Sequence, residues 1–166
     1  MKISMMMSYA GGFVEGAARV VELESAGLDV VWIPEAYSFD AISQVGYLAA
    51  VTKRVEIGTG IINVYSRTAP LTAMTAAGCD YVSNGRFILG LGASGPQVVE
   101  GFHGVPYEKP MQRIKEYIAR SHLPMTVRLC KCRCQQEKVL GLVSRSKSST
   151  VPCVLIFRCG GRRSKD

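Results

Sequence analysis

The chain has 166 residues, enough for one domain with a substantial core, and a formal net charge of +7. The charge is uneven, because residues 1–118 have a net charge of −2 and residues 119–166 a net charge of +9. The basic excess therefore gives no reason to expect that the larger part binds a polyanion. No run of 18 apolar residues occurs, which argues against a membrane-spanning helix. Cys79 is the only cysteine before residue 119, which is typical of a reducing compartment, so we expect a cytoplasmic protein.

Four strands are predicted in the first 118 residues. They are nearly continuous apolar runs that begin at Lys2, Leu28, Val55 and Arg86. Strands of this kind are buried on both faces, as in a parallel sheet covered by helices.

Helices are predicted between and after these strands. Apolar residues recur at helical spacing in residues 14–26, 41–52, 71–82 and 110–118. Gly27 is a stop signal for the first helix, and Asp40 is a candidate N-cap for the second. The pattern is therefore four βα units in 118 residues.

Units of this size form either a (β/α) barrel or an open doubly wound sheet. A full barrel needs about eight units and about 250 residues. We predict an α/β fold, a partial TIM (β/α) barrel with four parallel strands in sequential order, followed by an unrelated basic, cysteine-rich tail. The first and fourth strands of such a half-barrel would have unpaired edges, so we also expect instability or self-association.

Glycines mark two places in these strands. Residues 90–95, GLGASG, match a dinucleotide-binding loop, but they lie in the fourth βα turn, and the acid about 20 residues on, Glu116, falls in a helix. We therefore favour a loop that permits close packing. Gly58 and Gly60 lie inside the third strand, where glycine indicates a bulge, a close approach to a ligand, or a bend without a ligand.

Two further residues are weaker candidates on pattern alone. Glu35 ends the second strand, at the edge where parallel α/β folds bind ligands, although a solvated loop carboxylate is the simpler interpretation. His103 is expected to be a loop residue rather than a catalyst.

The tail from residue 119 does not continue the βα alternation. MTVRLCKC, KVLGLV and PCVLIF are candidates for short strands. Cys130, Cys132 and Cys134 are too close in sequence to surround a tetrahedral ion easily, so we expect no metal. Only Phe157 offers a stacking surface for nucleic acid. A disordered tail without a selected role is the favoured interpretation.

Three segments together carry a family resemblance: GLDVVWIPEAY, RVEIGTGIINVYSRTAP and GRFILGLGASGPQVVEGFHGVPYEKPMQRIKEYI. They resemble the luciferase-like monooxygenases, and within that family the oxidoreductases that use the 5-deazaflavin coenzyme F-420. The resemblance covers about residues 1–118. It implies a TIM-type barrel with the deazaflavin at the C-terminal ends of the strands, and hydride transfer with a small organic substrate.

The resemblance also implies particular site residues. Its cofactor-binding positions match Gly60, Ile61, Ala93, Ser94 and Gln97. The Gly60–Ile61 bond matches a cis peptide that backs the deazaflavin ring. Glu35 matches an acidic position and would orient the substrate or a proton. Some relatives have a catalytic histidine where this chain has Ala36, so the sugar-phosphate dehydrogenases of the family fit poorly.

The second half of the family's barrel is not recognisable in residues 119–166. We attribute this region to a frameshift or a gene-model error, and expect the chain to bind the deazaflavin weakly or not at all. Two alternatives stay open: an FMN-dependent monooxygenase of the same family, and a non-enzymatic fragment whose basic tail binds nucleic acid.

Overall fold

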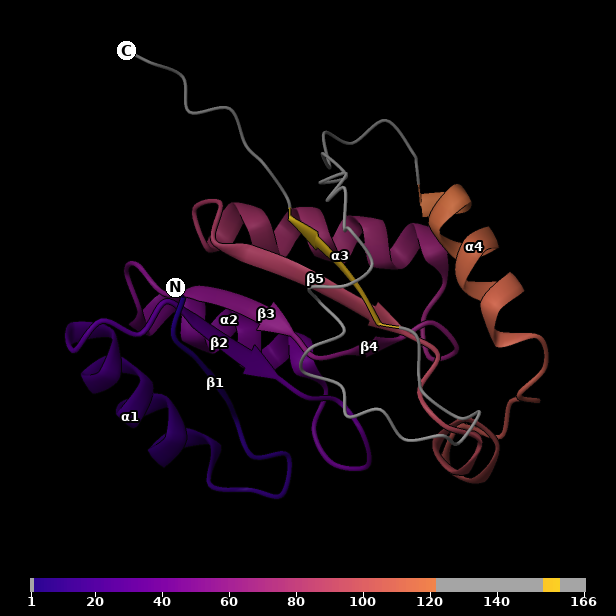
Figure 1. Cartoon of the computed structure of the whole chain (residues 1–166), viewed down its shortest axis with the longest axis horizontal. Coiled ribbons are helices and arrows are strands. Elements are labelled where there is room, and N and C mark those ends of the chain that lie inside the picture. The colour runs from indigo at the N-terminus through magenta and orange to yellow at the C-terminus, as the bar shows by residue number, and fades with distance from the viewer. Residues whose placement is uncertain (1, 122–153, 159–166) are drawn as a thin grey trace, which may run out of the picture.

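The structure is a computed structural model that describes residues 2–121 and 154–158 (Figure 1). Strands and helices alternate along residues 2–121. The strands are β1 (Ser4–Met6), β2 (Val30–Ile33), β3 (Glu56–Thr59), β4 (Ile62–Asn63) and β5 (Phe87–Gly92). The helices are α1 (Phe13–Ser25), α2 (Ala41–Val51), α3 (Ala69–Val82) and α4 (Pro110–Ser121), and a π-helical turn, η1 (Gln97–Phe102), precedes α4.

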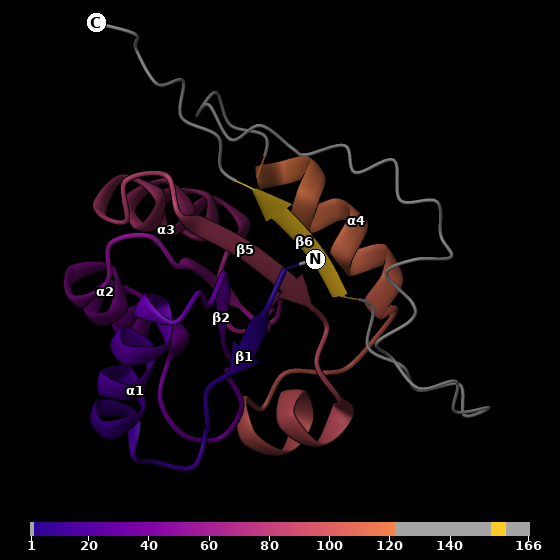
Figure 2. The same ribbon diagram turned by 60° about the vertical axis from the view of Figure 1, so that its left-hand side comes forward.

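The strands form one parallel sheet in the order of the sequence. β1 pairs with β2, β2 with β3, and β3 with β5, while β4 pairs further along β5. The sequential order predicted for a half-barrel is therefore confirmed, and the strand reversal of a doubly wound sheet does not occur in residues 2–121. Figure 2 shows α1, α2 and α3 on the same side of this sheet.

β3 and β4 are two parts of one predicted strand, separated by a bulge. Gly58 lies opposite Ile88 of β5, whereas Asn63 lies opposite Gly92, so five steps along one strand match four along the other. An extra residue on one strand bends the chain locally. The Gly60–Ile61 peptide in this break is cis, as the family resemblance implied.

The hydrophobic core lies between the sheet and the layer of helices. Val31, Ile57 and Phe87 occupy neighbouring strands at paired positions, and all three are almost fully buried. Because side chains alternate along a strand, Trp32 and Gly58, the next residues, face the opposite side. We call this opposite side the concave face.

The helix start predicted at Asp40 is confirmed. Its Oδ1 accepts hydrogen bonds from the backbone N–H groups of Ile42 at 2.9 Å and Ser43 at 3.0 Å. A capped start of this kind stabilises a helix by about 1 kcal/mol. It fixes the direction in which α2 leaves the loop after β2.

One strand of the tail belongs to the described residues. β6 (Val154–Arg158) pairs antiparallel with β5, so the expectation of an unpaired edge on the fourth predicted strand is wrong. The other candidate tail strands, and the cluster at Cys130, Cys132 and Cys134, lie outside the described residues. Of the helices in the described part of the chain, none is long and apolar enough to cross a membrane.

Candidate functional site

The sequence-predicted site residues lie along the carboxyl edge of the parallel sheet. Glu35 follows β2, the Gly60–Ile61 bond separates β3 from β4, Ser94 follows β5, and Gln97 begins η1. Carboxyl ends of parallel neighbouring strands meet at one edge, and this is the edge that carries ligand sites in barrels of this architecture. The topology therefore brings the predicted residues to one side of the sheet.

Asn63, at the end of β4, is a candidate that sequence reasoning missed. Its side chain is buried, with 2% of the residue exposed, and its Oδ1 accepts a hydrogen bond from the Tyr65 N–H at 2.9 Å. The Nδ2 atom is buried and has no hydrogen-bond partner. Because the preceding residue, Ile62, packs into the core, Asn63 faces the concave side. A donor is thus buried without a partner beside the bulge.

Trp32 explains one of the two strand glycines. Atoms of its ring lie 2.4–2.5 Å from the position that a Cβ at Gly58 would take. Any side chain at that position would therefore displace the indole. The requirement for Gly58 comes from this packing on the concave face, which is a reason that the sequence analysis did not consider.

Glu35 is engaged in a bidentate ion pair with Arg67. Its Oε1 lies 2.5 Å from Nη1 and its Oε2 2.9 Å from Nη2, and only 12% of its side chain is exposed. The Oε2 atom also accepts the backbone N–H of Ala41 at 2.9 Å. The hydrogen bond with Glu35 raises the pKa of Arg67 above its ordinary value. The pair joins the loop after β2 to the loop before α3.

A stack of aromatic and basic side chains holds the loop after β5. Ser94 has a left-handed backbone, with φ of 58°, and its carbonyl accepts the Tyr107 hydroxyl at 3.0 Å. Tyr107 stacks on Tyr65 at 5.5 Å between ring centroids, and the guanidinium of Arg113 lies 4.3 Å above the Tyr65 ring. Burial raises the pKa of both tyrosines. These side chains come from separate segments, so no single motif could have revealed them.

The remaining predicted residues of this loop differ in exposure. Ala93 is buried, whereas Gln97 is exposed at the start of η1. His103 directly follows η1 and contacts the Phe102 ring edge-on, which confirms it as a residue of the connecting loop. In the described residues, no group of three or more His, Cys, Asp or Glu side chains is placed to hold a metal ion.

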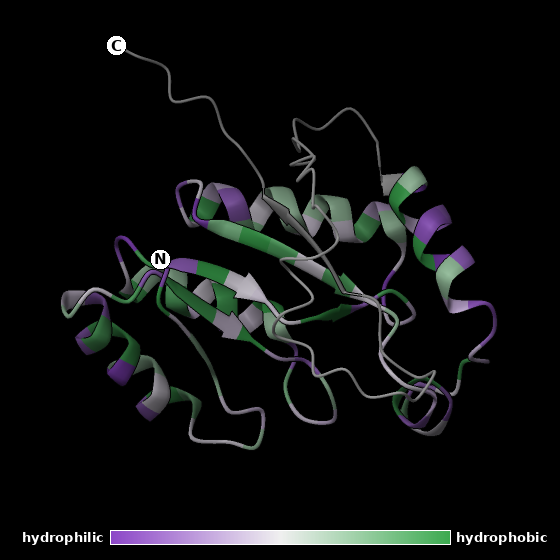
Figure 3. Ribbon diagram, viewed as in Figure 1, coloured by the Kyte–Doolittle hydropathy of each residue, from purple (hydrophilic) through white to green (hydrophobic). Residues whose placement is uncertain are grey.

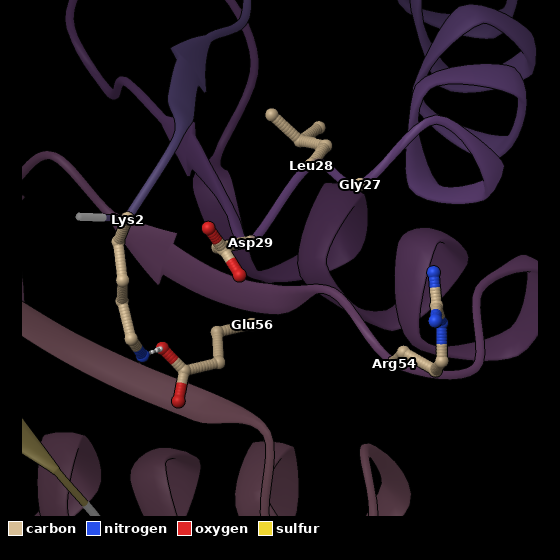
Figure 4. Close-up of a pocket in the computed structure, with 6 residues that line it drawn as sticks. All are labelled: Lys2, Gly27, Leu28, Asp29, Arg54 and Glu56. Atoms are coloured by element: carbon tan, nitrogen blue, oxygen red, sulfur yellow. Dashed lines mark hydrogen bonds and ion pairs between the residues drawn. The ribbon is translucent and has the colours of Figure 1, made fainter.

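A shallow cavity of about 270 Å³ lies at the opposite, amino edge of the sheet (Figure 4). Its charged side chains already have partners, within the cavity or just outside it. The Lys2 ammonium lies 2.6 Å from Oε2 of Glu56, and the Asp29 carboxylate accepts the Ile3 N–H at 2.8 Å. In (β/α) barrels, contacts at the amino end contribute to stability, whereas active sites lie at the carboxyl end.

The sheet order and the covering helices define part of a (β/α) barrel. The chain belongs to the luciferase-like monooxygenase family, whose model matches residues 1–123.

Three known proteins illustrate this similarity. A Mycobacterium tuberculosis protein classed as a coenzyme F-420-dependent oxidoreductase is 42% identical over 120 residues, which are 71% of this chain and 35% of that protein. The F-420-dependent tetrahydromethanopterin reductase of Methanopyrus kandleri superimposes with a TM-score of 0.64 at 23% identity, over 72% of this chain and 39% of the reductase. An FMN-bound oxygenating subunit of the 3,6-diketocamphane monooxygenase of Pseudomonas putida has a TM-score of 0.63 at 17% identity, over 72% and 38%. The chain thus spans about a third of the length of the curated relatives that it matches.

Proposed function

We propose that this chain carries the ring-binding part of an oxidoreductase that transfers a hydride between coenzyme F-420 and a small organic substrate. Membership of the family supports the reaction class. The 42% identity to a coenzyme F-420-dependent oxidoreductase supports the deazaflavin as cofactor. Because the chain spans 35% of that relative, the proposal concerns the carboxyl ends of β2 to β5.

The unpartnered amide of Asn63 is the observation that carries this proposal. A buried donor without a partner costs about 1–3 kcal/mol, so a ligand that supplies an acceptor is stabilised there. A deazaflavin ring has carbonyl oxygens along one edge, which suit the Nδ2 donor. We therefore add Asn63 to the proposed cofactor-binding residues, which are Gly60, Ile61, Ala93, Ser94 and Gln97.

The chain's other residues would position the reactants. When bound, the deazaflavin supplies the hydride-transfer chemistry, and the protein orients it and keeps water away. The Tyr107 hydroxyl fixes the Ser94 carbonyl, which steadies the loop beside the proposed ring site. Arg67 binds both carboxylate oxygens of Glu35. We therefore propose that Glu35 acts indirectly: it holds the Arg67 guanidinium in place, and this arrangement orients the substrate or a proton.

Cofactor titration of three forms of the chain tests the proposal. The fluorescence of coenzyme F-420 is followed as wild type, Asn63→Asp or Gln112→Ala is added. Asn63→Asp keeps an oxygen for the Tyr65 N–H and removes the Nδ2 donor, whereas Gln112 is an exposed amide on α4 and serves as control. We expect weak binding by wild type and by the control, and a Kd about 5- to 150-fold higher for Asn63→Asp.

The possible outcomes test the proposed cofactor binding and the role of Asn63 separately. Wild type that leaves the coenzyme's fluorescence unchanged at every concentration would contradict the proposed function. Equal binding by wild type and Asn63→Asp would retain the function and remove Asn63 from it. The same titration with FMN addresses the second candidate, an FMN-dependent monooxygenase, which tighter binding of FMN than of coenzyme F-420 would favour.

A further inference from the structure

An apolar surface lies on the concave face beside the cis peptide. Met6 of β1 stands opposite Trp32 of β2 and therefore shares its face of the sheet. A Cβ at Gly60 would meet the Met6 Cε at 3.7 Å and the Trp32 Cβ at 3.8 Å, so both side chains border the bulge. Met6 is 62% exposed. The proposed ring site thus adjoins apolar side chains on the concave face.

Charge is nearly absent from the parallel strands. Glu56, the first residue of β3, is the only charged residue within β1 to β5. It lies at the amino edge, where its carboxylate pairs with Lys2 at 2.6 Å. Figure 3 shows purple at the start of β3 and green to white along β5. These strands therefore offer no ionic partner to a ligand at their carboxyl ends.

Two aromatic rings meet beyond the carboxyl end of β3. Tyr37 belongs to the loop after β2, and Phe102 ends η1, which follows β5. Their ring centroids are 5.8 Å apart, and the rings are nearly perpendicular, at 78°. β3 lies between β2 and β5 in the sheet, and Figure 2 shows η1 beyond the arrowheads of β1 and β5. The contact therefore spans the edge at which the Gly60–Ile61 bond lies.

Packing of the core does not explain the Tyr37–Phe102 pair. Tyr37 is 53% exposed and Phe102 is 55% exposed, and neither belongs to the hydrophobic core. The loop that carries Tyr37 is nevertheless held in place, because the neighbouring Ser38 hydroxyl donates to the Tyr9 carbonyl. Aromatic side chains offer a large apolar contact area and lose little conformational entropy on binding. The pair is therefore suited to contact an apolar ligand.

The ionic groups next to this pair already bind each other. Glu35, two residues before Tyr37, binds Arg67 through both carboxylate oxygens, and its Oε2 also accepts the Ala41 N–H. A charged ligand would have to compete with this largely buried ion pair, or would lose its hydration without gaining an ionic partner. An uncharged apolar ligand meets neither penalty.

We propose that the substrate is an uncharged organic molecule whose apolar group packs against the Tyr37–Phe102 pair and Met6, next to the ring site. Identifying this ligand as the substrate rests on the proposed function, whereas its binding requires no cofactor. Small-molecule sites are lined mainly by apolar and aromatic side chains, with few polar groups that fix orientation. The surface beside the bulge has this composition.

Three probes of similar shape and different charge test this proposal. Benzamide is neutral, benzoate is an anion and benzamidine is a cation at neutral pH, and all three contain a phenyl ring. The Kd of each probe for the 166-residue chain is measured by ligand-observed NMR without cofactor. Failure of coenzyme F-420 to bind would contradict the proposed function and leave this measurement unaffected, so the two can fail separately.

Exposed aromatic residues provide matched variants. Tyr37→Ser and Phe102→Ser each remove one ring of the pair, and Tyr81→Ser, the control, removes a ring that is 87% exposed on α3. All three positions are exposed, so each variant should keep the fold, which circular dichroism checks. The usual strength of aromatic contacts predicts a Kd for benzamide about 2- to 12-fold higher in Tyr37→Ser and Phe102→Ser, and unchanged in Tyr81→Ser.

We expect wild type to bind benzamide at least about tenfold more tightly than benzoate or benzamidine, because neither charged probe finds a free ionic partner. Wild type that does not bind benzamide, or that binds a charged probe as tightly, would overturn the proposal. So would Tyr37→Ser and Phe102→Ser variants that bind benzamide as well as wild type does, or a Tyr81→Ser variant that loses as much affinity as they do.

Discussion

The Thr59 side chain bonds both backbone polar groups of Gly90, which the bulge leaves without a backbone partner on the neighbouring strand. The Gly90 N–H donates to Oγ1 of Thr59 at 2.9 Å, and that hydroxyl donates to the Gly90 carbonyl at 3.1 Å. Both residues are buried. The Thr59 carbonyl oxygen lies 2.0 Å from where a Cβ at Gly90 would be, so only glycine fits there.

Removing the Thr59 hydroxyl should destabilise the sheet. In Thr59→Val, the buried N–H and carbonyl of Gly90 lose their partner, at a cost of about 1–3 kcal/mol for each group. Urea unfolding measures the free energy of unfolding, and Thr59→Ser, which keeps the hydroxyl, is the control. Gly90→Ala should also be destabilising, because backbone must shift. A Thr59→Val protein as stable as Thr59→Ser would show that this bridge contributes nothing.

Glu24 should make the free energy of unfolding fall as the pH becomes acidic. Burial alone would raise its pKa, but hydrogen bonds from the backbone N–H groups of Val55, Arg54 and Lys53 outweigh burial and hold the pKa below 4.5. A lowered folded-state pKa means that the stabilisation is complete above about pH 4.5 and is lost as the pH falls through the folded-state value.

The test of this pH dependence compares two glutamates of α1. Glu24→Gln should lower the free energy of unfolding at neutral pH by about 2 kcal/mol, because charged acceptors form the stronger hydrogen bonds. It should also flatten the loss of stability below pH 4.5. Glu22→Gln, at an exposed position of the same helix, should do neither. Parallel pH profiles for wild type and Glu24→Gln would contradict this assignment.

The Glu35–Arg67 pair should show strong coupling in a double-mutant cycle. Glu35→Leu leaves a guanidinium that is 16% exposed without its carboxylate, so we expect a loss of about 2–4 kcal/mol in unfolding free energy. Glu35→Leu combined with Arg67→Met removes both charges and should cost less than the single change. Additive losses, measured by urea unfolding, would mean that the two side chains act independently.

The composition of residues 119–166 leads to a prediction about the reading frame of the gene. The family match stops at residue 123, close to the change in charge and composition at Ile118. We therefore propose that this region is read out of frame. Translation of the same DNA in the other two frames should then yield further βα units of the family just after Ile118. If neither frame contains such units, the region is native to the chain.

Much of the fold could be predicted because each βα unit has a local signature. The apolar runs located the four strands, and Asp40 marked the start of α2 from its own sequence. Gly58 and Gly60 indicated the place of the break between β3 and β4, but not that one residue is inserted there, because that depends on the register with β5. The candidate strand PCVLIF overlaps β6, but its pairing with β5 was beyond a local pattern, since it joins segments that are far apart in the chain.

The site was only partly predictable for a similar reason. Glu35, Gly60 and Ser94 stand in recognisable segments, so the family resemblance could propose them as site residues. The free amide of Asn63 follows from which neighbour its oxygen binds, and no spacing of residue types encodes that choice. Glu24 lies in an amphipathic helix, where a carboxylate usually predicts contact with water, yet it binds the backbone of the loop after α2.

The position of Trp32 makes the protein's intrinsic fluorescence a probe of the proposed ring site. It is the only tryptophan of the chain, and its side chain lies beside Gly58 and Gly60 on the concave face. Indole emission overlaps the absorption of flavins and deazaflavins, so a ring bound next to the bulge would quench the fluorescence of Trp32 by energy transfer. Occupancy of the proposed ring site could therefore be followed in the unlabelled protein as a loss of tryptophan fluorescence.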